Sequence, residues 1–291
     1  MSESFLIQSL ASGVLIGGVY ALVALGLNVI FGVMKIINFA HGALMMLAMY
    51  VTFVLFRNLA IDPYRSLFLT VPVLFLLGVV IQRVLIRPVL NAPDHNQLLL
   101  TLGLSMFIEQ GALVLWGAEP RALKLAYTDS VVYLGGVSIG VTRLVAFALA
   151  IIFSGFVFWL LQKTDTGKAL RAASEERDGA ALSGIPVGRI YMWAFGLGTA
   201  CVGAAGALVT PFLYIAPSVG DVFNVTAFIV VVLGGMGNAM GALVGGLIIG
   251  IVESLGAALL PGSLKQLVTF AVFVAILLFK PEGILVRSAD A

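Results

Sequence analysis

The sequence predicts an all-α, polytopic transmembrane helical bundle of about 8–9 membrane segments, and three observations carry this prediction. Of the 291 residues, 61% are hydrophobic and 10% are charged, whereas soluble domains carry about 25% charged residues. The apolar stretches are continuous and do not alternate in polarity, which argues against a β-barrel. Five stretches without a charge reach or nearly reach the about 20 residues that a spanning helix needs: 4–34, 36–56, 144–162, 190–220 and 222–252.

The apolar runs predict a helix for each membrane segment. The first is about 45 Å long at 1.5 Å per residue, so we expect it to tilt, protrude or break, with Gly17 and Gly18 as the candidate break. The last two long segments are separated only by the glycine-rich stretch 234–238, and one of them is a candidate re-entrant half-helix. The predicted helices cover about 5–34, 38–56, 66–87, 97–117, 142–162, 190–213, 222–237, 239–260 and 265–280.

The lysines and arginines favour an orientation with the N-terminus outside and the C-terminus inside. The opposite orientation would place the most charged loop outside. Ten of the 16 basic residues then face the cytoplasm: Lys35, Arg83, Arg87, Lys163, Lys168, Arg171, Arg177, Arg189, Lys280 and Arg287. The other six face outward: Arg57, Arg65, Arg121, Lys124, Arg143 and Lys265.

Two loops differ in character. The segment 118–140 predicts an external loop with some strand or turn structure. The loop at about 163–189 holds nine of the 30 charges, and its alanines and charges predict a short helix that ends at Gly184-Ile185-Pro186. Composition alone leaves two interpretations of this helix open, an ordinary solvated loop or a docking helix for a soluble partner.

Several polar side chains fall inside apolar segments, where a polar group is costly and faces the bundle interior or a pathway. For each, a helix–helix hydrogen bond and a pathway role are both open. We expect Asn28, Asn38 and His41 to fix the bend between the first two helices. We expect Glu109 to be paired or protonated. The pathway or packing candidates are Asn28, Asn38, His41, Glu109, Gln110, Asn224 and Glu253.

Other features of the composition limit the function further. The single cysteine, Cys201, cannot form an internal disulfide. A net charge of +2 gives no sign of nucleic-acid binding, and we expect no cofactor, metal or catalytic group. Glycine pairs at or near four-residue multiples predict close helix contacts, static or sliding: Gly13/Gly17, Gly198/Gly206, Gly237/Gly241 and Gly246/Gly250.

Two stretches carry a family resemblance. The first reads GGVYALVALGLNVIFG over 17–32 and continues as IINFAHG over 36–42. The second comprises LRAA at 170–173, SGIP at 183–186 and VVLGGMGNAMGALVGG at 231–246. Together they resemble the N-terminal signature, coupling loop and glycine-rich tail of Liv-type permease subunits, which belong to ATP-binding cassette importers for branched-chain amino acids.

The resemblance implies a single transmembrane permease domain over 1–291 in the bacterial inner membrane, with a cytoplasmic coupling loop at about 163–189. It implies two ATP-binding subunits, a second and usually non-identical permease, and a periplasmic substrate-binding protein. The cargo would be leucine, isoleucine and valine, or related amino acids and small amides. ATP hydrolysis is expected on the partner, since no G-x-x-x-x-G-K-[ST] loop occurs here. The residues expected to couple to the ATPase are Arg171, Glu175, Glu176, Arg177, Asp178 and Gly184.

Two other functions compete with this interpretation. An ion-coupled secondary transporter or channel would explain Glu109 and Glu253 without a partner, and it predicts transport by this chain alone. It does not account for the NFAHG motif or the charged loop. An intramembrane enzyme would need a nucleophile–base pair or a metal cluster, yet the chain has only two histidines, His41 and His95, and no H-E-x-x-H motif.

Overall fold

The computed structural model describes residues 3–134, 136–260, 265–280 and 283–284. Within them all nine predicted helices are present, and the all-α fold class is confirmed. Seven helices are long and apolar enough to cross a membrane, and two apolar helices are shorter. The elements are α1 (Glu3–Met34), α2 (His41–Leu59), α3 (Pro63–Ile81), η1 (Gln82–Ile86), α4 (Arg87–Val89), α5 (Asp94–Trp116), β1 (Val131–Leu134), β2 (Val137–Gly140), α6 (Val141–Lys163), α7 (Asp165–Glu175), α8 (Arg177–Leu182), α9 (Val187–Val209), α10 (Val219–Gly234), α11 (Ala239–Leu259) and α12 (Lys265–Phe279).

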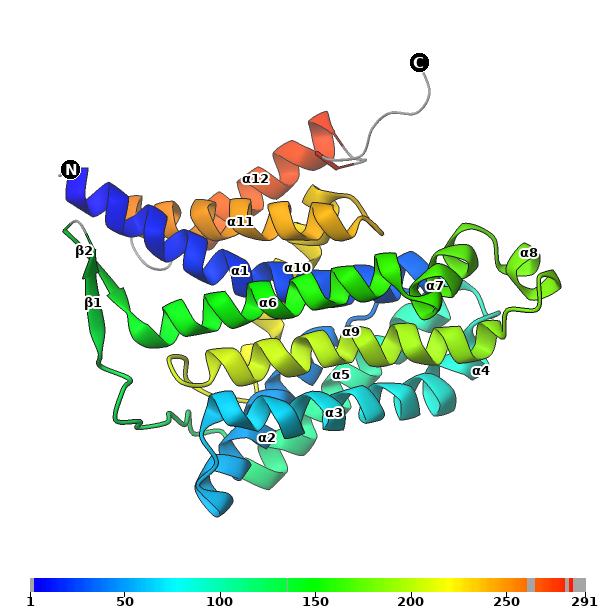
Figure 1. The fold of residues 1–291 in the computed structure, drawn as a ribbon, viewed down its shortest axis with the longest axis horizontal. Coiled ribbons are helices and arrows are strands. Elements are labelled where there is room, and N and C mark those ends of the chain that lie inside the picture. The colour runs from blue at the N-terminus through cyan, green and yellow to red at the C-terminus, as the bar shows by residue number, and fades with distance from the viewer. Residues whose placement is uncertain (1–2, 135, 261–264, 281–282, 285–291) are drawn as a thin grey trace.

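The strand character expected in 118–140 takes the form of a hairpin. Strands β1 and β2 pair antiparallel, with Val131 opposite Gly140 and Leu134 opposite Val137. The Gln8 side chain attaches α1 to the hairpin, since its Nε2 donates to the Ser138 carbonyl oxygen at 2.7 Å. The hairpin therefore lies beside the N-terminal end of α1, as Figure 1 shows at the left.

The expected break in the first helix does not occur. Helix α1 is continuous over 32 residues, and Gly17 and Gly18 serve packing instead. A Cβ atom at Gly17 would lie 2.9 Å from the Gly246 carbonyl oxygen of α11, and one at Gly18 would collide with the Phe147 ring of α6. Glycine inside a helix keeps the backbone hydrogen bonds, so here it permits close approach of neighbouring helices and does not end the helix.

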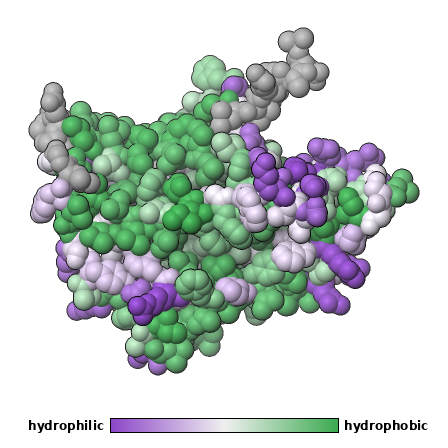
Figure 2. Space-filling view, viewed as in Figure 1, coloured by the Kyte–Doolittle hydropathy of each residue, from purple (hydrophilic) through white to green (hydrophobic). Residues whose placement is uncertain are grey.

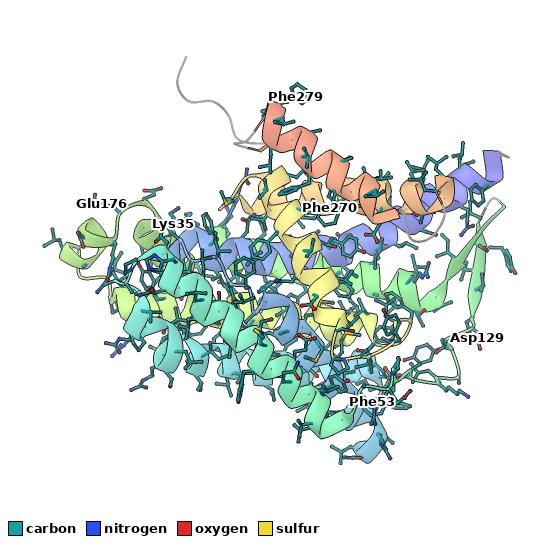
Figure 3. All side chains as sticks on the ribbon, turned by 180° about the vertical axis from the view of Figure 1, so that it is seen from behind. Lys35, Phe53, Asp129, Glu176, Phe270 and Phe279 are labelled. Atoms are coloured by element: carbon teal, nitrogen blue, oxygen red, sulfur yellow. The ribbon has the colours of Figure 1, made fainter. Side chains whose placement is uncertain are left out.

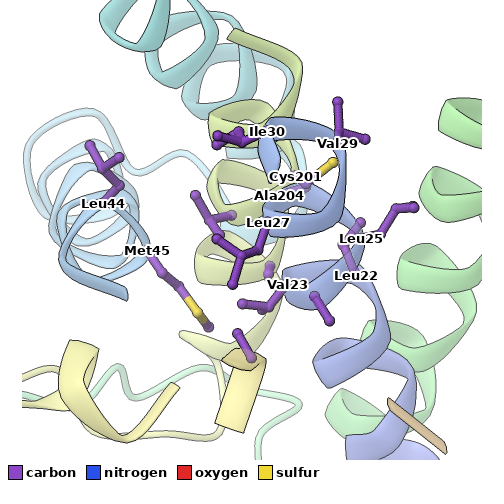
Figure 4. Close-up of a cluster of buried hydrophobic side chains, with 14 of the residues drawn as sticks. Leu22, Val23, Leu25, Leu27, Val29, Ile30, Leu44, Met45, Cys201 and Ala204 are labelled. Atoms are coloured by element: carbon purple, nitrogen blue, oxygen red, sulfur yellow. The ribbon is translucent and has the colours of Figure 1, made fainter. Parts of the chain in front are cut away.

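Helices α1 and α9 form the centre of the bundle. Helix α11 packs along α1, and α3 packs along α9. Figure 4 shows Leu27 of α1, Leu44 of α2 and Ala204 of α9 gathered in one cluster of buried side chains. Between helices in lipid, such packing is favoured mainly by van der Waals contact, since lipid tails are as apolar as leucine.

The two ends of the bundle differ. Helices α4, α7 and α8 lie at one end, the α7–α8 end, and the hairpin lies at the other, the hairpin end (Figure 1). In the reverse view of Figure 3, Lys35 and Glu176 share the α7–α8 end and Asp129 lies at the hairpin end. Figure 2 shows a broad apolar surface between the ends, with hydrophilic side chains gathered mainly at the α7–α8 end. The predicted cytoplasmic residue Arg287 lies outside the described residues.

Candidate functional site

The chain bends sharply between α1 and α2, and the bend is buried. The segment 35–40 returns into the bundle, and α2 begins at His41, whose Nε2 lies 2.9 Å from the Val23 carbonyl oxygen. Val23 precedes the end of α1 by 11 residues, which is about 16 Å of helix. The Asn38 side chain accepts a 3.1 Å hydrogen bond from the backbone N–H two residues later. Both Asn38 and His41 are fully buried, and they hold the start of α2 inside the bundle.

Asn28 does not stabilise the bend between α1 and α2, where we expected it to act. Its hydrogen-bond partners lie in the turn between α10 and α11. Its Nδ2 donates to the Asn238 carbonyl oxygen at 2.9 Å, and its Oδ1 accepts from the Gly237 N–H at 2.8 Å. Gly237 has a φ of +87°, a backbone conformation that glycine adopts without strain. Asn28 therefore attaches α1 to the turn between α10 and α11. No local pattern could reveal partners so far away in the sequence.

Helix α10 also begins in the interior. The Asn224 side chain accepts a 3.2 Å hydrogen bond from the Gly42 N–H in the first turn of α2. A Cβ atom at Gly220 would lie 2.7 Å from the Gly42 carbonyl oxygen, so the two helix starts touch. With 16 residues, α10 is about 24 Å long, less than the hydrocarbon thickness of about 30 Å. Figure 3 shows it steeply inclined to α1.

Glu253 lies in α11 toward the hairpin end, between two cavities. One, of about 280 Å³, also borders Tyr20 and Arg143. The other, of about 210 Å³, borders Asp221 and Thr226 of α10. The Tyr20 and Glu253 side chains interact directly. An ionisable side chain within a membrane segment is costly, so it faces the bundle interior or a cavity, and both hold for Glu253.

The two polar residues of α5 are less enclosed than the sequence suggested. Glu109 is half-buried and Gln110 is exposed. Asp221 of α10 is the charged neighbour whose field acts on Glu109. The structure therefore sets Glu109 near a second carboxylate, and Gln110 on the outer surface of the bundle.

The charged loop forms two helices where the sequence predicted one. Thr164 caps α7 by accepting a 3.0 Å hydrogen bond from the Gly167 N–H. Glu176 then has an extended backbone, with φ −148° and ψ 114°, and this ends α7 and begins α8. Leu170 and Ala173 are buried against the bundle, so one face of α7 is held and the other is left outside.

The six expected coupling residues share this helix pair and divide by contact. Arg171 donates to the Leu161 carbonyl oxygen of α6. Arg177 donates to Asn91 Oδ1 at 3.0 Å, and its guanidinium lies 5.9 Å from the centre of the Tyr191 ring. Gly184 follows α8 with a φ of +82°, the αL conformation common after helices. The remaining three side chains are exposed: Glu175, Glu176 and Asp178.

A cavity of about 610 Å³ lies between this helix pair and the interior. Arg171 and Ser174 of α7 border it, and so do Asn28 of α1 and the turn 236–240. Helix α7 therefore shares a cavity with the turn that Asn28 holds. The cavity therefore borders both α7 and the turn that joins α10 to α11.

Side chains that could bind a metal are dispersed in the part of the chain that the structure describes. No group of three or more His, Cys, Asp and Glu side chains is close enough there to hold a metal ion. The Cys201 thiol is free and fully buried in α9. Cys201 faces α1, where a Cβ atom at Gly26 would lie 2.8 Å from its own Cβ.

Sequence reasoning missed Tyr20, Arg143 and Asp221 as site residues. The sequence indicates Arg143 only as an outward charge and gives Asp221 no role. The available signal is that each begins a long uncharged stretch, so each sits where a helix enters the apolar region. Tyr20 gave no signal, since tyrosine is common near membrane interfaces.

Comparisons with known proteins agree over the whole chain. The family described as "Branched-chain amino acid transport system / permease component" matches residues 9–277. The chain is 33% identical over 302 residues to the "High-affinity branched-chain amino acid transport system permease protein LivH" of Escherichia coli (strain K12), covering 99% of this chain and 98% of that protein.

Two more distant relatives carry related names. The "High-affinity branched-chain amino acid transport system permease protein BraD" of Pseudomonas aeruginosa is 28% identical over 97% of this chain and 96% of its own length. The "Probable branched-chain amino acid transport permease protein LivH" of Methanocaldococcus jannaschii is 29% identical over 94% of this chain and 91% of its own length. No solved structure matches the chain.

Proposed function

Because the chain belongs to the family of branched-chain amino acid transport permeases, we propose that it forms the translocation pathway for leucine, isoleucine and valine, or for related small amino acids and amides. The chain is a permease subunit of an ATP-binding cassette importer. The observation that carries the proposal is the 33% identity to LivH over 99% of the chain. An identity of this extent includes every helix that encloses the cavities at both ends.

A permease of this kind works with ATP-binding and substrate-binding partners. We propose the finer assembly that the family suggests: two ATP-binding subunits at the α7–α8 end, a second and non-identical permease beside this one, and a periplasmic binding protein at the hairpin end. The chain would be one membrane domain over 1–291 in the bacterial inner membrane, with its N-terminus outside. The grouping of basic residues supports this orientation, since Lys35 lies at the α7–α8 end.

The proposed coupling mechanism is mechanical. ATP hydrolysis takes place on the partner, and its movement pushes the segment 163–189. The exposed carboxylates of Glu175, Glu176 and Asp178 face the partner, while Arg171 and Arg177 hold the helix pair to the bundle. Movement of α7 then changes the cavity that it shares with Asn28 and the turn 236–240. Because this turn joins α10 to α11, its displacement would move both helices together.

The coupling proposal is tested by reversing the three exposed charges in the complete importer. The variant Glu175→Lys/Glu176→Lys/Asp178→Lys should reduce substrate-stimulated ATPase activity by about tenfold or more, equivalent to losing roughly 1.4 kcal/mol of coupling. Assembly of the two permeases should be unchanged, since these side chains are exposed. The matched control Glu175→Asp/Glu176→Asp/Asp178→Glu keeps all three charges at the same exposed positions and should retain full stimulation.

Two outcomes would contradict the proposal. Full stimulation in the triple variant would remove α7–α8 from the coupling surface. Uptake by the purified chain alone in liposomes, without ATP or partners, would replace the importer with the alternative of an ion-coupled transporter.

A further inference from the structure

The cavity of about 280 Å³ near the hairpin end has a mixed wall. It lies where α1, α6, α10, α11 and the segment after α9 meet. Apolar side chains form most of its surface: Leu15, Ile16, Phe212, Leu213 and Phe223. Two side chains of opposite charge complete it, Arg143 and Glu253. Its volume is near the lower end of the range of about 300–1,000 Å³ for small-molecule pockets.

The two charges come from different elements and are held separately. Arg143 is the third residue of α6, and its guanidinium lies 5.9 Å from the centre of the Phe212 ring. Glu253 belongs to α11 and interacts with the buried Tyr20 of α1. A guanidinium matches a carboxylate in geometry and charge, and a carboxylate matches an ammonium group. An apolar wall between them suits an aliphatic side chain.

The cavity has a neighbouring cavity on each side. A neighbouring cavity of about 260 Å³ shares Ser12, Leu15, Arg143 and Phe212 with it and reaches Ser138 of the hairpin. On the other side, Glu253 also borders the cavity of about 210 Å³ beside α10. A solute entering from the hairpin end would therefore meet Arg143 first and Glu253 second.

We propose that this cavity is a binding subsite for the amino-acid cargo, in which Arg143 receives the α-carboxylate and Glu253 the α-ammonium group. The apolar wall receives the aliphatic side chain. The choice of ligand rests on the proposed function, whereas the pairing of opposite charges is a property of the cavity. A zwitterion satisfies both charges at once, so it enters without carrying net charge into the apolar region.

Cysteine protection measures occupancy of this cavity directly. The native Cys201 is fully buried, so the wild-type chain should react little with a membrane-impermeant methanethiosulfonate. Ser12 borders both the proposed subsite and the neighbouring cavity of about 260 Å³. The variant Ser12→Cys therefore places a thiol in the wall of the subsite. The control Ser130→Cys lies in an exposed loop at the same end. Ala257→Cys, which borders the larger of these two cavities, replaces Ser12→Cys if that variant does not assemble.

The measurement is the labelling rate in the importer assembled without its substrate-binding protein, as L-leucine is added. Leucine should slow labelling of Ser12→Cys severalfold and leave Ser130→Cys unchanged. Adding Arg143→Gln or Glu253→Gln should raise the leucine concentration needed by about tenfold or more, the size expected for one charge-assisted hydrogen bond. Leucinamide, which lacks the carboxylate, should protect poorly in wild type, and Arg143→Gln should remove the difference between leucine and leucinamide.

Each failure has its own meaning. An importer that takes up leucine with ATP, but whose Ser12→Cys and Ala257→Cys thiols react equally with and without leucine, would overturn the subsite. Equal protection of Ser130→Cys, or protection unaffected by both charge variants, would overturn it as well, because either result indicates a conformational change and not occupancy. Absence of ATP-driven uptake of any branched-chain amino acid, related small amino acid or amide would instead overturn the proposed function.

Discussion

Helices α9 and α5 are the same length and lie in opposite environments. Both have 23 residues and are apolar enough to span a membrane, yet 89% of the most apolar part of α9 is buried and only 11% of that of α5. Helix α5 presents large apolar side chains on its surface, with Phe107 77%, Val114 84% and Leu115 72% exposed. Apolar character alone therefore does not distinguish an interior helix from a peripheral one.

Side-chain size makes the distinction. Gly196, Gly198, Gly203 and Gly206 of α9 all lie against neighbouring helices, whereas Gly103 and Gly111 of α5 have nothing within 4 Å of where a Cβ atom would be. Small residues let helix backbones approach closely, and that close packing holds helices together in lipid. In this bundle the apolar character of a helix determines that it lies in the membrane. Its small residues determine whether it packs at the centre of the bundle.

The largest expected effect comes from filling one glycine in each helix. A Cβ atom at Gly206 would lie 2.7 Å from the Met45 carbonyl oxygen and 2.8 Å from the Ala48 Cβ atom of α2. Gly206→Leu should therefore force α2 away from α9 and lower the free energy of unfolding by about 3 kcal/mol or more. Gly111→Leu in α5 should change it by less than about 0.5 kcal/mol. Thermal unfolding of the purified complex, followed by size-exclusion chromatography, compares the two.

Either of these two variants can contradict the contrast between a closely packed α9 and an exposed α5. If Gly206→Leu retained the wild-type unfolding temperature, α2 and α9 would not be closely packed in the functional protein. A large loss of the second permease with Gly111→Leu would show that the exposed face of α5 is an interface between subunits and not a lipid surface.

A smaller difference is expected between buried and exposed polar residues. Asn28→Ala removes two hydrogen bonds to the turn after α10, of 2.9 and 2.8 Å, and leaves the Gly237 N–H and the Asn238 carbonyl oxygen without these partners. The expected loss is about 2 kcal/mol. Gln110→Ala on the exposed face of α5 should cost less than about 0.5 kcal/mol.

Hydrogen exchange of the amides in 235–240 measures the effect at the turn itself. Faster exchange there in Asn28→Ala, with no change in Gln110→Ala, is the expected result. Unchanged exchange in both variants would mean that the turn is held by other contacts, and Asn28 would lose its role as the connection between α1 and α10–α11.

The sequence was sufficient to predict where the helices lie along the chain. It was insufficient to predict which helices contact one another. Uncharged stretches and hairpin-prone residues lie along the chain, so nine helices and the strand character of 118–140 could be predicted from local pattern. The attachment of Asn28 to Gly237 joins residues 209 apart, and no periodicity encodes such a contact. The continuity of α1 through Gly17 and Gly18 depends on α11 and α6, which supply the packing that the glycines permit.

The same limit applies to the candidate site. Glu253 could be selected because a charge in an apolar stretch is costly wherever it faces. Arg143 could not be assigned to the same cavity, because its neighbour Phe212 and its counterpart Glu253 belong to distant segments. The break at Glu176 was also missed, since a charged, alanine-rich segment is compatible with one helix or with two.

The smallest expected effect concerns the loop that follows α5. The Tyr127 hydroxyl donates to Asp62, which also caps α3 by accepting a 2.9 Å hydrogen bond from the Tyr64 N–H. Burial, together with the hydrogen bond to Asp62, raises the pKa of Tyr127 above its ordinary value. Tyr127→Phe should lower the free energy of unfolding by about 1 kcal/mol at neutral pH. Differential thermal unfolding against wild type measures this loss.

The raised pKa of Tyr127 gives the prediction a sign in pH. Below about pH 10 this tyrosine is protonated in both the folded and the unfolded chain. Above that pH the unfolded chain loses the proton while the folded chain keeps it, so the stabilisation by Tyr127 declines. The advantage of wild type over Tyr127→Phe should therefore be constant from pH 6 to 9, to within about 0.3 kcal/mol, and should shrink above about pH 10. A constant advantage through pH 11 would mean that Tyr127 is not held by Asp62. The loop after α5 would then lack this attachment to α3 and would be as free of contacts as the exposed face of α5.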